Sequence, residues 1–61
     1  MIELTDENGN TVVINPAYIV CMGRTERNGK HFTHIMLQDR IEVLVMESLS
    51  TIKTLISKVK K

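Results

Sequence analysis

Residues 35–46 read IMLQDRIEVLVM and decide the fold. Two runs rich in branched apolar residues flank the polar segment 38–40, which predicts two antiparallel strands joined by a short connection. Side chains alternate between the two faces of a strand. Three residues of the second run, Ile41, Val43 and Val45, therefore share a face with Ile35 of the first, and we expect an amphipathic helix to cover that face.

The residues that follow have the pattern of this helix. Glu47 ends the strand region, and Ser48 has a side chain suited to an N-cap, because its oxygen can accept a hydrogen bond from an amide of the first turn. Apolar residues then recur at helical spacing and form a stripe on one side. These residues are Leu49, Ile52, Leu55, Ile56 and Val59. The pattern predicts a helix over residues 48–60.

The residues upstream of 35–46 alternate between extended runs and turn signals. The dipeptides Asn8-Gly9 and Asn28-Gly29 each favour a tight hairpin turn, and Asn15-Pro16 breaks the chain because proline cannot donate to a strand ladder. The extended runs are about 1–5, 11–14, 19–25, 31–37 and 41–46. The predicted fold is α+β, a single domain over 1–61 in which a small antiparallel β-sheet of four to five strands is followed by one C-terminal helix packed on it.

A chain of 61 residues builds a small core. Such a core rarely contributes more than roughly 3–5 kcal/mol without a disulfide, a metal or an oligomer to support it. The one cysteine, Cys21, excludes an internal disulfide and is typical of a reducing compartment. Association with another subunit is therefore the expected source of additional stability.

The second face of the predicted sheet is also apolar, although a face exposed to water should be polar. Its residues are Met22, Met36, Leu44 and Met46, with Val20 and Phe32 at the edges. Two interpretations follow. Either the sheet curves into a small barrel that buries both faces, or this methionine-rich face packs against a second copy or another protein. The second interpretation predicts a homodimer or small homo-oligomer.

No group of residues has the spacing of a catalytic, cofactor or metal site. His31 and His34 are three residues apart on a strand, which places them on opposite faces. Cys21 with a histidine is the minimal skeleton of a thiol nucleophile, but no third orienting group accompanies it, and we expect a small buried residue there. The sequence predicts a protein that is not an enzyme.

Basic residues suggest an alternative function in nucleic-acid contact. They form two loose groups, Arg24, Arg27 and Lys30 near the second hairpin and Lys58, Lys60 and Lys61 at the end of the helix. The net charge is only +1, and no aromatic residue lies near the second group to stack on bases. Contact with nucleic acid is therefore a second hypothesis.

The expected location is the cytoplasm, without direct insertion into a membrane. No apolar run approaches the roughly 20 residues that a membrane-spanning helix needs. Residues 1–7 are acidic and alternating, which is unlike a signal peptide.

The order of these short motifs resembles the FlbD-type small proteins of flagellar and swarming motility. The resemblance rests on Met1-Ile2-x-Leu4-Thr5, Asn8-Gly9, Ile14-Asn15-Pro16, Ile19, Leu37 and Val45-x-Glu47-Ser48. It implies a small cytoplasmic accessory protein of bacterial motility that acts through protein contacts and lacks catalysis. The strands followed by the Glu-Ser-capped helix also resemble part of the LytTR type of DNA-binding domain, which implies, as the alternative, a small nucleic-acid-binding regulatory module.

Overall fold

The computed structural model describes residues 1–59. The elements follow the order β1 (Ile2–Thr5), β2 (Thr11–Ile14), the 3-10 turn η1 (Pro16–Tyr18), β3 (Ile19–Arg27), β4 (Lys30–Leu37), the 3-10 turn η2 (Gln38–Arg40), β5 (Ile41–Val45) and α1 (Leu49–Val59). The predicted α+β class is confirmed. The last residue of the predicted helix, 60, lies outside the described residues.

The strands form two antiparallel sheets where one was expected. β1 pairs with β2, and β3, β4 and β5 form a second sheet in that order. The sheets join at one corner, where the N–H of Met46 donates to the carbonyl of Thr5 over 2.7 Å and Asp6 bridges Val45. Because β2 and β3 are not neighbours in a sheet, the strands do not form a closed barrel in the described part of the chain.

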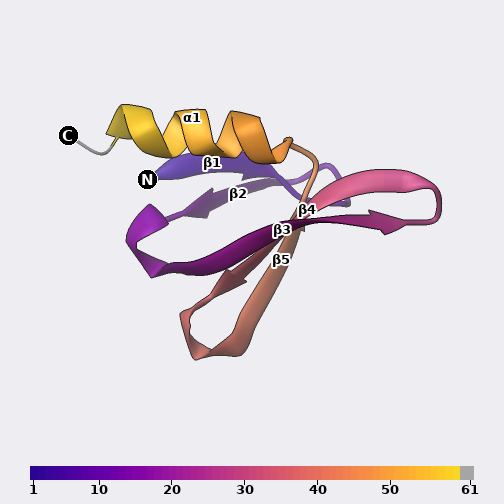
Figure 1. Ribbon diagram of the computed structural model, residues 1–61, viewed down its shortest axis with the longest axis horizontal. Helices are drawn as coiled ribbons and strands as arrows, with labels where there is room; N and C mark the ends of the chain where they lie inside the picture. The colour runs from indigo at the N-terminus through magenta and orange to yellow at the C-terminus, as the bar shows by residue number, and fades with distance from the viewer. Residues whose placement is uncertain (60–61) are drawn as a thin grey trace.

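The β3–β4 hairpin is longer than predicted and extends beyond the other elements as a two-stranded arm (Figure 1). β3 continues to Arg27 and β4 begins at Lys30, so Asn28 and Gly29 alone make the turn. Their φ angles are 55° and 77°. Two consecutive left-handed residues are what a two-residue hairpin turn of the favoured twist requires.

Replacing Gly29 with alanine is expected to destabilise the protein by about 1 kcal/mol, because the new Cβ is disfavoured at a positive φ. No heavy atom lies within 4 Å of that Cβ position, so the penalty comes from the backbone alone. Gly23 is the matched control, since its surroundings are equally open and its φ is ordinary. Urea unfolding should show the loss for Gly29→Ala and none for Gly23→Ala; equal effects would contradict the argument.

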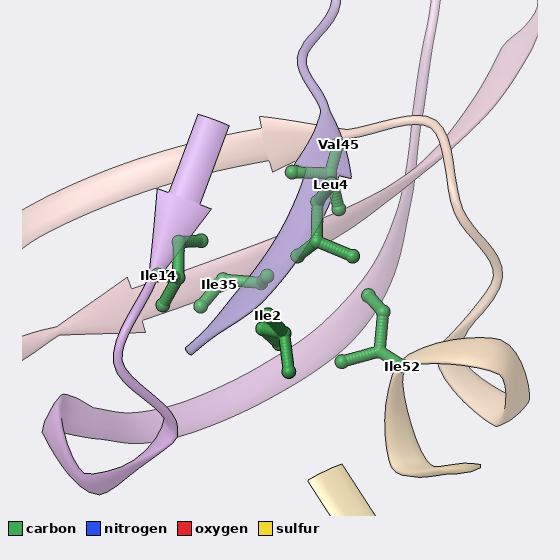
Figure 2. Packing of buried hydrophobic residues seen from close by; sticks show 6 residues of the cluster. All are labelled: Ile2, Leu4, Ile14, Ile35, Val45 and Ile52. Atoms are coloured by element: carbon green, nitrogen blue, oxygen red, sulfur yellow. The ribbon is translucent and has the colours of Figure 1, made fainter. Parts of the chain in front are cut away.

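The core lies between the two sheets and the helix. Within residues 1–59 it is formed by six buried apolar residues: Ile2, Leu4, Ile14, Ile35, Val45 and Ile52. Figure 2 shows these side chains gathered between β1, β2, β4, β5 and α1, with Ile52 reaching in from the helix. The helix therefore covers the core-facing side of the two sheets, where it contacts β1 and β3.

The connection between β5 and α1 is held by side chains distant in sequence. The hydroxyl of Thr33, which is 2% exposed, donates to the carbonyl of Glu47 over 2.7 Å. The carboxylate of Glu47 accepts from the N–H of Thr5, at 2.9 and 3.0 Å to its two oxygens. Glu47 thus joins β1, β4 and the start of the helix, a role that sequence reasoning missed when it treated this residue only as the end of a strand.

Candidate functional site

The candidate site is the face of the β3–β4–β5 sheet that points away from the core, here called the outer face. Ile35 and Val45 point inward to the core. Strand alternation then directs His34, Met36 and Leu44 to the other side, and the register sets His34 opposite Leu44. β1, β2 and α1 pack on the inner side, so they leave the outer face uncovered within residues 1–59.

Apolar side chains on the outer face are partly open to solvent. Val20 is 63% exposed and Met46 is 50% exposed. Phe32, Met36 and Leu44 are half-buried. Single exposed apolar residues are ordinary on a protein surface, but a contiguous apolar patch commonly marks a contact with another molecule. By strand register and alternation, five of the six residues predicted to form an apolar second face belong to the outer face: Val20, Phe32, Met36, Leu44 and Met46.

The sixth predicted residue, Met22, was placed on the wrong face. It pairs with Ile35 and packs against the core. The reason is a register shift in β3 between Ile19 and Cys21. Such an irregularity inserts an extra residue and exchanges the faces to which the following side chains point.

The same shift explains a second error, at Cys21. The thiol was expected to be buried, but it is exposed and its residue pairs with Met36. If the side chains of β3 alternated regularly from Ile19, Cys21 would point to the core and Met22 to the outer face. The periodicity of the sequence carries no signal for this shift, because residues 19–23 are apolar or small and tolerate either face.

Two titratable side chains, His34 and Glu42, lie close together on the outer face. Nε2 of His34 is 3.4 Å from Oε1 of Glu42, on the neighbouring strand. His31 is exposed in the hairpin arm and does not join them. Within residues 1–59 no three His, Cys, Asp or Glu side chains come together in a way that could hold a metal ion.

The basic residues predicted to contact nucleic acid are dispersed. Arg24 lies beside the start of α1, whereas Arg27 forms an ion pair with Glu7 at 3.3 Å. Lys30 is exposed at the hairpin turn, and Lys58 lies in the last turn of α1. That turn is about 15 Å from the start of the helix at 1.5 Å per residue. Lys60 and Lys61 lie outside the described residues.

In the part of the chain that the structure describes, no helix combines the length and apolar character needed to cross a membrane. Comparison with protein-family models, with curated proteins and with solved structures found no match to this chain.

Proposed function

We propose that this protein is a non-enzymatic interaction module that associates with a second copy of itself through the outer face. The observation that carries the proposal is the partly exposed apolar surface of Phe32, Met36, Leu44 and Met46 on the outer face, which the core-packing side of α1 does not cover within residues 1–59. Burying apolar surface contributes about 25 cal/mol per Å². A second copy placed on this face would remove it from water.

The size of the core supports the same proposal. Within residues 1–59, only six apolar side chains are buried. Stability gained at an interface adds to that of the folded subunit by mass action.

Replacing Leu44 with glutamate is expected to convert the oligomer to monomers, because a buried unpaired carboxylate opposes association. Far-UV circular dichroism should remain native-like, since Leu44 points away from the core. Sedimentation velocity at about 100 μM protein measures the mass. Val13→Glu is the matched control, because Val13 is 57% exposed on β2, away from the outer face; its mass should equal that of the wild type.

Two results would contradict the proposal. One is a wild-type protein that sediments as a monomer at this concentration. The other is an oligomer that persists in Leu44→Glu. Should Leu44→Glu unfold, Met46→Glu provides the same test, because Met46 is 50% exposed and a charge there is compatible with the fold.

The resemblance to the FlbD-type small proteins adds a cellular context to this proposal, an accessory role in bacterial motility through protein contacts. Deleting the gene in a motile host should reduce swarming, and the wild-type chain should restore it. Rescue by Leu44→Glu equal to that of the wild type would separate the motility role from association. The dispersed basic residues give the alternative of nucleic-acid binding no comparable support.

A further inference from the structure

A cavity of about 330 Å³ lies between the β3–β4 arm and the start of α1. It exists because β4 extends further than β5 at this end of the sheet. β5 ends at Val45, which pairs with Thr33, whereas β4 begins three residues earlier, at Lys30. After Val45 the chain turns from the sheet toward α1, so that no strand fills the space beside the arm. Its walls include Arg24, His31, Phe32, Met46, Ser48 and Ser50.

Two basic side chains line this cavity without a carboxylate partner. In the described part of the chain neither Arg24 nor His31 forms an ion pair, in contrast to Arg27 of the same hairpin. Glu47 also lines the cavity. However, both of its carboxylate oxygens accept from the N–H of Thr5 in β1.

The other lining residues considered are either hydroxyl-bearing or apolar. Ser48 and Ser50 bring hydroxyl groups, with their oxygens 3.3 Å apart. Phe32 and Met46 bring apolar surface. A guanidinium and an imidazole beside hydroxyl donors suit the oxygens of a phosphate or carboxylate, and arginine makes charge-assisted, often bidentate bonds to such groups. The apolar wall suits an uncharged body attached to the anion.

We propose that this cavity binds an oxyanion carried on a small apolar group, with Arg24 as the principal contact. The cavity shares Phe32 and Met46 with the outer face proposed for association. Arg24 lines the cavity and Leu44 does not, so the Arg24 and Leu44 variants that test the two proposals can fail separately.

The test is an NMR titration of the ¹⁵N-labelled protein with phenyl phosphate. Saturable amide shifts should appear at the residues that line the cavity, and phenol, which lacks the anion, should produce none of comparable size. Arg24→Gln should weaken binding at least about tenfold, the effect of losing one charge-assisted hydrogen bond. Arg27→Gln, in the same hairpin but paired with Glu7, should bind as the wild type does.

The proposal is overturned if phenol produces the same shifts, if Arg24→Gln titrates like the wild type, or if no shift saturates. Because Arg24 is exposed, its replacement should leave the rest of the amide spectrum unchanged. The dipeptide acetyl-Phe-Asp-amide distinguishes the source of the anion. Tighter binding of the dipeptide assigns the site to an acidic side chain of a partner protein, and tighter binding of phenyl phosphate assigns it to a small phosphate ester.

Discussion

Replacing Ile52 with alanine is expected to unfold most of the protein at 25 °C. Ile52 is fully buried and is the one buried residue of α1 within the described residues. Removing a buried isoleucine side chain to alanine costs about 2–5 kcal/mol, from lost transfer energy and from the cavity left behind. A domain of this size has roughly 3–5 kcal/mol available from its core, so the two quantities are comparable.

Thermal unfolding followed by circular dichroism measures this effect. Val59→Ala is the control, because Val59 lies on the same helix but is 47% exposed. Its effect should stay within about 0.5 kcal/mol, as for most surface substitutions. A folded Ile52→Ala with nearly unchanged stability would mean that the helix contributes little to the core, against the packing in Figure 2.

Replacing Thr33 with valine is expected to cost about 1–3 kcal/mol, although the two side chains have the same shape. The change removes the hydroxyl that donates to the carbonyl of Glu47 over 2.7 Å. Thr33 is 2% exposed and the hydrogen bond is part-buried at the wall of the cavity, so water replaces the lost donor less readily than on an exposed surface. An acceptor that loses its donor at such a site carries a desolvation cost.

Thr54→Val is the matched control for this substitution. The hydroxyl of Thr54 donates to the carbonyl of Ser50 over 3.0 Å, the same kind of bond, but on the exposed side of α1. Water can replace the donor there, so the loss should stay below about 0.5 kcal/mol. Urea unfolding of both variants compares the two sites. Equal losses would show that burial of the bond between Thr33 and Glu47 does not determine its contribution.

The local elements were predictable because their signals are short-range. Asn28-Gly29 predicted a turn, and both residues adopt the positive φ values of a tight hairpin. The stripe that includes Ile52 predicted the helix, and the structure buries that residue. The alternation around Ile35 and Val45 correctly identified the inner face of the central strands.

The candidate site was predictable only in part. Met36 and Leu44 were correctly assigned to one face because β4 and β5 pair in regular register. Met22 and Cys21 were assigned to the wrong faces because the shift in β3 arises where this strand pairs with β4. The cavity beside Arg24 was not foreseen, since its walls come from the hairpin arm and from the start of the helix.

The amino-acid sequence by itself determined the order of strands and helix, the hairpin turns and the presence of apolar side chains on both faces of the central strands, because these depend on backbone preferences and on the period of neighbouring residues. Only the tertiary structure decided that the strands divide into two sheets, that Glu47 joins them to the helix and that Met22 turns inward. These features depend on contacts between residues far apart in the chain, such as Thr5 with Glu47, and no local pattern records which distant groups will meet.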